Sequence, residues 1–330
     1  MTARTRTFRI FAAGAAVVLA AAACSSGGRE KTDDTASGGG NAAGSSGYTI
    51  AFITHETPGD TFWDKVKNGA NQAAKDTGVT LKYSNDPEAP KQAVLIQNAV
   101  DSKVSGIATT LVTPDALAGS VKAATDAGIP VVGFNSGLDQ YQKLGALMYF
   151  GSDETLAGTT AGKRLADQGA KHPLCVIQQT GSVALEARCA GVKTSVPGTE
   201  NIQVNGADDA AVTSTLQAKL AQDKSIDAIV TLGAPQALDA IKAKEQAGSE
   251  AKLVTFDLNE QAATEIKNGN IVFSIDQQPY VQGYMAVTSL YLNIKNGNDI
   301  GGGKPVLTGP SFVDSENIDK IIPFTKNNTR

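Results

Sequence analysis

The sequence contains few of the residues that build metal, cofactor and nucleophilic catalytic sites. Its 330 residues include three cysteines and two histidines, and aromatic residues make up only 5%. The histidines lie far apart and no Cys-x-x-Cys pair occurs, so no metal site is expected. No dinucleotide fingerprint follows the first predicted strand, residues 301–305 lack the pattern of a phosphate loop, and no Gly-x-Ser-x-Gly elbow accompanies His55. The sequence therefore predicts neither a cofactor nor an enzyme.

Charge of one sign and long hydrophobic runs are also scarce. The 29 basic and 33 acidic residues give a net charge of −4, and loss of residues 1–23 would remove Arg4, Arg6 and Arg9 and change it to −7. Such a chain has no electrostatic reason to bind nucleic acid or an anionic lipid surface. With 41% hydrophobic and 19% charged residues, the composition excludes a disordered, collagen-like, coiled-coil or multi-span membrane protein. The length suits about two domains.

The first 47 residues predict an export signal and a tether. The apolar run 10–22 follows the basic residues, and its thirteen residues are too few to cross a bilayer about 30 Å thick. Three alanines precede Cys24, which resembles the bacterial lipoprotein signal, although that signal usually has Leu where this chain has Ala21. We expect a signal peptide over 1–23 and lipidation of Cys24, the alternative being a plain secretory signal. Residues 24–47 contain this cysteine and a Gly/Ser-rich stretch that predicts a flexible linker.

The odd number of cysteines suggests a disulfide in an exported protein. If Cys24 carries lipid, Cys175 and Cys189 remain, and an oxidising compartment allows them to pair. Cys175 lies in a predicted strand and Cys189 in the helix that follows it. The closed loop of about 15 residues would stabilise the fold by about 3 kcal/mol. The alternative is two buried free thiols.

From residue 48 to about 297, short β-rich runs alternate with amphipathic helical stretches. Near-continuous apolar strands that alternate with helices indicate parallel sheets covered on both faces. Gly78, Gly106 and Gly128 precede strands, as expected for glycines that end helices. Four such units before residue 150 and a comparable set after it predict an α/β fold with two similar, doubly wound parallel-sheet lobes. The predicted strands are 49–54, 79–83, 106–111, 129–134, 175–178, 228–232, 252–256 and 271–275.

Polar side chains gather where these strands end. In open parallel sheets, ligands bind beyond the carboxyl ends of the strands, and two facing lobes would form a cleft. The residues combine carboxylate acceptors, amides that both donate and accept, and a guanidinium with five donors. A polyhydroxy ligand needs this mixture, because each hydroxyl donates and accepts. Each residue also has a simpler interpretation as a cap or turn former. The residues are His55, Asp60, Asn135, Arg188, Asp257 and Gln277.

Two aromatic residues stand beside each other after the first predicted strand. Phe62 and Trp63 begin the predicted helix, and Asp60 can cap it. As chain neighbours, the two rings are not expected to face the same core. A ring at such a turn suits stacking on the C–H face of a sugar, and the alternative is packing within its own lobe.

The order of several short motifs resembles one family. They are Asp60-Thr61-Phe62-Trp63, Asn135, Gly151-Ser152-Asp153, Glu186-Ala187-Arg188-Cys189-Ala190-Gly191, Thr255-Phe256-Asp257 and Asp276-Gln277-Gln278-Pro279. The chain from about residue 48 onward resembles the periplasmic sugar-binding proteins of the ribose/galactose type, the solute receptors of ABC importers. The resemblance implies that Phe62 and Trp63 stack on the ligand and that Arg188, Asp257 and Gln277 bind its hydroxyls.

The same resemblance implies two lobes that are joined by three crossovers and close like a hinge. Lobe 1 would comprise 48–152 and 279–309, and lobe 2 would comprise 153–277 and 310–330, with crossovers near 151–154, 276–279 and 309–313. Two positions depart from the family. Asn135-Ser136 stands where many members have Asp-Arg, and Gly233-Ala234 where ribose receptors have Asn-Asp. These departures favour a smaller ligand, a sugar alcohol or another pentose over ribose.

The sequence thus predicts an extracytoplasmic substrate-binding lipoprotein, anchored by lipid at the cell membrane. It would bind a neutral monosaccharide or sugar alcohol by hinge closure and deliver it, as a monomer, to an ABC permease. A signalling or chemotaxis receptor for a sugar or autoinducer would use the same cleft and stays open as an alternative. A transcription regulator of this fold would need a basic N-terminal helix-turn-helix, which the Gly/Ser-rich stretch does not provide.

Overall fold

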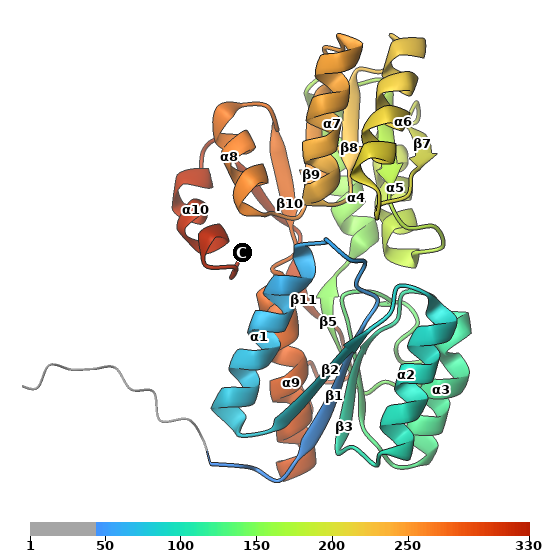
Figure 1. Ribbon diagram of the computed structural model, residues 1–330, viewed down its shortest axis with the longest axis vertical. Coiled ribbons are helices and arrows are strands. Elements are labelled where there is room, and N and C mark those ends of the chain that lie inside the picture. Colours follow the sequence, from blue (N-terminus) through green and yellow to red (C-terminus); the bar gives the residue numbers. More distant parts are fainter. Residues whose placement is uncertain (1–43) are drawn as a thin grey trace, which may run out of the picture. The chain divides into compact units, whose positions relative to one another are not determined.

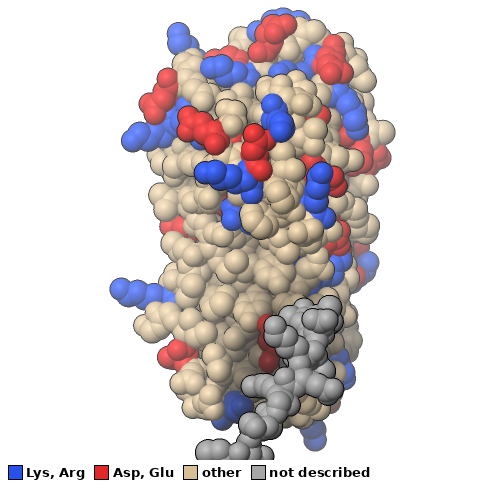
Figure 2. Space-filling model, turned by 90° about the vertical axis from the view of Figure 1, so that its left-hand side faces the viewer, with Lys and Arg blue, Asp and Glu red and all other residues tan. Residues whose placement is uncertain are grey.

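The computed structural model of the protein describes residues 44–330 (Figure 1). The predicted signal peptide, the lipidation of Cys24 and linker residues 24–43 lie outside the described residues. Within residues 44–330, no helix has the length and apolar character needed to cross a membrane. On the face drawn in Figure 2, basic and acidic side chains are intermixed over the upper part of the molecule.

Two six-stranded sheets form the centres of two lobes, and their strands follow equivalent orders (Figure 1). Every strand pair is parallel except β10 with β12, which is antiparallel. In lobe 1 the order is β11 (Val306–Gly309), β5 (Met148–Ser152), β4 (Val131–Phe134), β3 (Gly106–Thr110), β1 (Thr49–Thr54) and β2 (Thr80–Asn85). In lobe 2 it is β12 (Ser311–Asp314), β10 (Phe273–Asp276), β9 (Lys252–Phe256), β8 (Ala228–Thr231), β6 (Pro173–Ile177) and β7 (Glu200–Gln203). The predicted α/β class with two parallel-sheet lobes is confirmed.

Helices cover both faces of each sheet. Lobe 1 carries α1 (Phe62–Thr77), α2 (Ala89–Asp101), α3 (Pro114–Asp126) and α9 (Pro279–Asn296). Lobe 2 carries α4 (Glu154–Asp167), α5 (Val183–Ser195), α6 (Asp209–Gln222), α7 (Ala234–Ala247), α8 (Glu260–Asn268) and α10 (Ile318–Lys326). The chain passes between the lobes three times: from β5 to α4, from β10 to α9, and from β11 to β12.

The alternation of side chains along each strand explains why both sheet faces need a helical layer. In β1, Ile50 and Phe52 belong to the apolar cluster under α1 and α9, whereas Ala51 and Ile53 belong to the cluster under α2 and α3. Successive side chains of a strand point to opposite faces, so a strand that is apolar throughout must be buried on both.

Close contact between α4 and α5 fixes the position of Arg188. A Cβ atom on Gly158 of α4 would lie 2.1 Å from the carbonyl oxygen of Arg188 on α5, which no side chain could tolerate without movement. Glycine therefore lets the two helices approach until their backbones touch. The helix that carries Arg188 is held rigidly at the edge of the lobe.

A disulfide joins Cys175 of β6 to Cys189 of α5, as predicted from the odd number of cysteines. Both residues are completely buried, and their Cα atoms are 5.8 Å apart. The bond ties β6, which lies between β8 and the edge strand β7, to the helix that carries Arg188, and the two cysteines are 14 residues apart in sequence.

Loss of this disulfide should destabilise the protein by about 3 kcal/mol, because a loop of this length restricts the unfolded chain by about that amount. The disulfide can be removed by unfolding the protein, reducing it and refolding it in reductant. Urea unfolding of this reduced protein should then show the loss of stability. The Cys175→Ala/Cys189→Ala variant should lose slightly more, since it also loses two buried sulfur atoms. An unchanged unfolding midpoint in reductant would contradict the prediction.

A buried ion pair lies at the second crossing between the lobes. Asp276, the last residue of β10, is fully buried, and its carboxylate accepts hydrogen bonds from the amide of Gln278 at 2.9 Å and from Nε of Arg330 at 2.6 Å. The carbonyl oxygen of nearby Asn328 accepts a bond from Nδ2 of Asn68 on α1, at 3.2 Å. The segment after α10 thus neutralises the crossing strand and also contacts lobe 1.

Arg330→Gln should destabilise the protein by about 2–4 kcal/mol, because it leaves the carboxylate of Asp276 buried without its cation. Urea unfolding measures this loss. Lys326→Gln, an exposed change near the end of α10, serves as the matched control and should shift stability by less than about 0.5 kcal/mol. Equal effects of the two variants would show that the pair does not stabilise the crossing.

Candidate ligand-binding cleft

A small cavity lies between the lobes at the carboxyl ends of the strands. Its volume is about 60 Å³, room for several water molecules. All eight residues predicted from the sequence line it: His55, Asp60, Phe62, Trp63, Asn135, Arg188, Asp257 and Gln277. Each is nine-tenths or more buried except Asp60, which is half-buried. The structure therefore brings these residues together in one cleft between the lobes.

Asn135 and Asp257 occupy equivalent positions in the two lobes. Asn135 directly follows β4 and Asp257 directly follows β9, with φ angles of 63° and 64°. The left-handed region is costly for most residues, but asparagine and aspartate tolerate it. Their backbone amides donate to Phe150 and Ile275 of the neighbouring strands, at 2.9 and 3.0 Å. This turn directs each side chain into the cavity, so residue type and backbone conformation agree at both strand ends.

The amide of Gln277 connects these two strand ends. Its Oε1 accepts a hydrogen bond from Nδ2 of Asn135 at 3.2 Å, and its Nε2 donates to Oδ1 of Asp257 at 2.9 Å. Gln282 of α9 also donates to Oε1 of Gln277, at 3.0 Å. The orientation of the amide is fixed by these partners, and Gln277 links lobe 1 to lobe 2 at the crossing.

Arg188 is held in place by three different groups. Its Nε donates to Oε2 of Glu154 at 2.6 Å, and its Nη1 donates to the carbonyl oxygen of Leu232 at 3.2 Å. The guanidinium also lies over the ring of Phe256, 4.6 Å from its centroid. Asp257 Oδ2 is 4.0 Å from Nη1. Glu154 therefore neutralises the arginine, while the remaining donors face the cavity and Asp257.

Three aromatic rings form one side of the cavity. The Trp63 ring packs edge-on against His55, with centroids 4.8 Å apart, and against Phe62 at 5.0 Å. Phe62 and Trp63 both belong to the apolar core of lobe 1, so the expectation that they cannot share one core is wrong. At the start of α1 no preceding turn separates the two side chains, and both rings can turn inward while one edge lines the cavity.

His55 is neutral in this setting. Burial, with a smaller contribution from the charge of Arg188, lowers the pKa of His55 to about 3. Its Nδ1 lies 2.8 Å from Oγ1 of Thr110. The imidazole thus presents a polar but uncharged edge.

Burial raises the pKa values of the carboxyl groups, whereas it lowers the pKa of His55. It raises the pKa of Asp60 to about 6 and that of Asp257 to about 7, despite the nearby charges of Lys65 and Arg188. Asp60 Oδ1 accepts a bond from the amide of Phe62 at 3.0 Å, so Asp60 contacts the helix start as predicted, although the N-cap residue of α1 is Thr61. Near neutral pH the two acids, Glu154, Arg188 and Lys65 come close to electrical balance, so the site favours an uncharged ligand.

Sequence reasoning missed several residues of the site. The cavity is also lined by Gln178, Gln179, Ser182 and Gln236, and buried Lys65 lies behind it with its Nζ donating to the carbonyl of Thr61 at 3.0 Å. Gln178 directly follows β6, so the strand-end rule could have found it. Gln236 enters from the first turn of α7, and no pattern in the sequence marks it.

The comparisons with known proteins agree with this geometry. The model of a periplasmic binding protein domain matches residues 50–299. The chain belongs to this family. Members of the family are substrate-binding proteins rather than enzymes, so the predicted family and the predicted absence of enzyme activity are both confirmed.

Several periplasmic binding proteins are similar over most of their length. A carbohydrate transporter from Acidothermus cellulolyticus, solved in complex with myo-inositol, is 55% identical, with a TM-score of 0.85 over 86% of this chain and 99% of that one. The xylose/arabinose-binding protein of Sulfolobus acidocaldarius is 25% identical over 83% of this chain and 73% of that protein. The ribose import binding protein of Haemophilus influenzae is 25% identical over 75% and 85%.

The raised pKa of Asp257 predicts a pH-dependent stability. Because its folded pKa of about 7 exceeds its ordinary value of 3.8, the folded state binds more protons than the unfolded state between these values. This contribution is complete below about pH 4 and is lost as pH rises through about 7. Asp257→Asn should therefore stabilise the ligand-free protein at pH 8, by at most about 4 kcal/mol, and far less at pH 5.

Urea unfolding of the ligand-free protein at both pH values measures this effect. Asparagine keeps the left-handed turn and the acceptor for Gln277, so the variant changes charge with little change in shape. Asp319→Asn, on exposed α10, is the control and should show no such difference. A stabilisation of the same size at pH 5 and pH 8 would exclude the proposed cause.

Proposed function

We propose that the protein is an extracytoplasmic receptor that closes its two lobes around one neutral cyclic polyol, myo-inositol or a close relative in size and stereochemistry. The observation that carries this proposal is the polar cavity between the lobes, lined by carboxyl, amide and guanidinium groups. The bound myo-inositol in a relative that is 55% identical over 86% of this chain supports the choice of ligand.

The polar groups of the cavity suit hydroxyls on every side of a ring. Asp60 and Asp257 each use one carboxylate oxygen within the protein, at Phe62 and Gln277, and each retains another oxygen as an acceptor. Arg188 and the amides of Asn135, Gln178 and Gln236 supply donors around the same space. A ring hydroxyl both donates and accepts, so a polyol can satisfy both sets at once.

The aromatic side of the cavity suits the other surface of such a ligand. Trp63 and Phe62 present apolar ring edges beside polar groups. The C–H groups of a polyol ring are the apolar part that can pack there, and this contact contributes by burial of apolar surface. Asn135 in place of a charged residue keeps that end of the site uncharged and favours a ligand that lacks charge.

The cellular role follows from the family and from the N-terminal sequence. We infer that Cys24 carries a lipid, that the Gly/Ser-rich stretch tethers the two-lobed body to the outer face of the membrane, and that the closed form delivers its ligand to an ABC permease. The basic residues, the short apolar run and the small residues before Cys24 support the anchor.

Titration calorimetry tests the ligand assignment. We expect myo-inositol to bind at least about tenfold more tightly than ribose, xylose, arabinose or galactose, a difference of about 1.4 kcal/mol. Inositol monophosphate should bind poorly, since its negative charge would upset the near electrical balance of the site. If a pentose or hexose bound in preference to every inositol isomer, the ligand would be a sugar rather than a cyclic polyol.

Asp257→Asn tests the site itself. The change removes a charged acceptor and should weaken binding by about 10- to 100-fold, the usual contribution of a hydrogen bond to a charged group. Asp319→Asn should bind as the wild type does. An unchanged dissociation constant in Asp257→Asn would remove Asp257 from the ligand site.

A further inference from the structure

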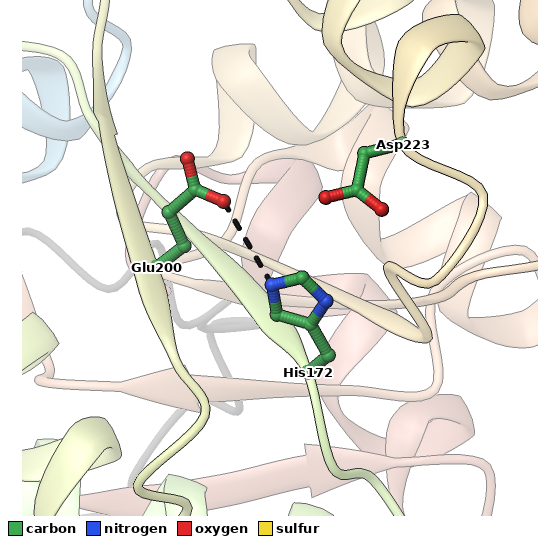
Figure 3. A group of neighbouring side chains, drawn as sticks. All are labelled: His172, Glu200 and Asp223. Carbon is green, nitrogen blue, oxygen red and sulfur yellow. Dashed lines mark ion pairs between the residues drawn. The ribbon is translucent and has the colours of Figure 1, made fainter.

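Three potential metal ligands converge at the end of lobe 2 that lies away from the cleft. His172 immediately precedes β6, Glu200 is the first residue of β7, and Asp223 follows α6 (Figure 3). Each offers one ligand atom, and the three atoms lie within 4.8 Å of one another. Residues 51 positions apart in sequence thus meet because β6 and β7 begin side by side, beneath the end of α6.

The hydrogen bonds around His172 fix which ring nitrogen is free. Oγ of Ser225 lies 2.6 Å from Oδ1 of Asp223, to which it donates its single proton. The same Oγ lies 2.8 Å from Nδ1 of His172, so it must accept a bond from Nδ1–H. In the neutral ring Nε2 therefore carries the lone pair, which is the form that binds a metal ion.

With the ring neutral, this arrangement places two acceptors against each other. Nε2 of His172 lies 3.7 Å from Oε2 of Glu200 (Figure 3). A lone pair and a carboxylate oxygen repel each other unless a positive charge stands between or beside them. Asp223 adds a second carboxylate, at the C-terminal end of α6 where the helix dipole also disfavours negative charge.

Lys219 currently supplies the compensating charge. Its Nζ lies 2.8 Å from Oε2 of Glu200 and 3.7 Å from Oδ2 of Asp223. The lysine pairs with these two partly exposed carboxylates, and its long side chain can turn out into solvent. A divalent cation would replace one positive charge by two at the same place.

The backbone that carries His172 is itself fixed. Asp227 accepts hydrogen bonds from the amides of Lys171 at 2.6 Å and His172 at 3.0 Å. The turn before β6 therefore does not depend on the imidazole for its conformation, and a substitution at His172 should leave it intact.

We propose that His172, Glu200 and Asp223 bind one Zn²⁺ ion, with Lys219 displaced and water in the fourth position. Bonds of about 2.0–2.1 Å in a tetrahedron separate ligand atoms by about 3.4 Å, close to the present distance of 3.7 Å between His172 and Glu200. An imidazole ligand selects Zn²⁺ over Ca²⁺ or Mg²⁺, which prefer oxygen ligands alone. The ion would join β6, β7 and α6 at one end of the lobe.

Because the chain has few histidines and cysteines, zinc binding can be attributed to this site. The only other histidine, His55, is buried in the cleft, and Cys175 and Cys189 are bonded to each other. Cys24 is the remaining cysteine. In the full chain with Cys24→Ser and without a polyhistidine tag, binding that requires an exposed imidazole can therefore come only from His172.

Titration with zinc chloride against a chromophoric chelator measures the affinity. We expect one Zn²⁺ per chain, a loss of at least about tenfold in affinity in His172→Gln, and a several-fold gain in Lys219→Met, which removes the competing cation. Asp319→Asn, an exposed carboxylate elsewhere in lobe 2, should bind as the parent does. Ca²⁺ in excess should not displace the ion.

The thermal midpoint without metal separates a binding effect from a folding defect. His172→Gln should keep the midpoint of the parent in chelator and should lose only the rise that zinc chloride causes. Equal affinity in the parent and His172→Gln, or no affinity gain in Lys219→Met, would overturn the proposal. Because the site lies away from the cleft, either result leaves the polyol assignment untouched.

Discussion

The bridge that Gln277 forms between Asn135 and Asp257 is the interaction on which the cleft depends. It joins the carboxyl ends of two equivalent strands from different lobes, at 3.2 and 2.9 Å, and it does so from a segment that crosses between them. A side chain at this place must be both donor and acceptor, because one neighbour is an amide and the other a carboxylate. Glutamine meets both demands without charge, which spares the closed cleft another buried ion.

If the proposed ligand binds here, the buried charges near this bridge serve binding at some cost in stability. Asp257 and Asp60 are held where burial disfavours their ionised forms, and Lys65 is buried with a single backbone acceptor. A core of apolar residues in the same volume would be more stable. Only Arg188 has an ion-pair partner, Glu154, at close range, so its orientation is set before a ligand arrives. The same groups thus weaken the fold and pre-organise its recognition surface.

The parts of the fold that follow from local patterns were predictable. Strand β1 and strand β9 have the predicted bounds, since each is a short apolar run between polar turns. Strand β7 was missed because it is an edge strand whose burial alternates, and its sequence Glu-Asn-Ile-Gln carries no apolar run. Strands β11 and β12 lie at the third crossing, where pairing with β5 and β10 rather than hydrophobicity defines them. The prediction that Gly106 ends a helix is wrong, because this residue begins β3 and makes room for Leu290 of α9.

The residues of the site also divide into those that could be predicted from the sequence and those that could not. Residues that directly follow strands, such as Asn135 and Asp257, could be found because topology brings strand ends together whatever the details of packing. Gln236 and Lys65 could not, since each reaches the site from a helix whose rotation is set by its neighbours. The group formed by His172, Glu200 and Asp223 was missed for the same reason, because packing in three dimensions brings it together. Metal-site reasoning from sequence looks for close spacing, and only tertiary structure brings one histidine beside Glu200 and Asp223.

The contacts between the lobes are consistent with the proposed closure around a ligand. Away from the crossing segments, the hydrogen bonds within residues 44–330 that join the lobes directly are uncharged and long: Asn68 to Asn328 at 3.2 Å, Val183 to Val112 at 3.3 Å, and Asn259 to Thr61 and Gln179 to Pro87 at 3.4 Å. The ion pairs of this part of the chain lie within single lobes or at the crossing. Such contacts stabilise the closed form only slightly, so a ligand that binds polar groups of both lobes supplies the differential affinity that shifts the equilibrium. In the proposed mechanism, the weakness of the direct contacts between the lobes is what makes closure depend on the ligand.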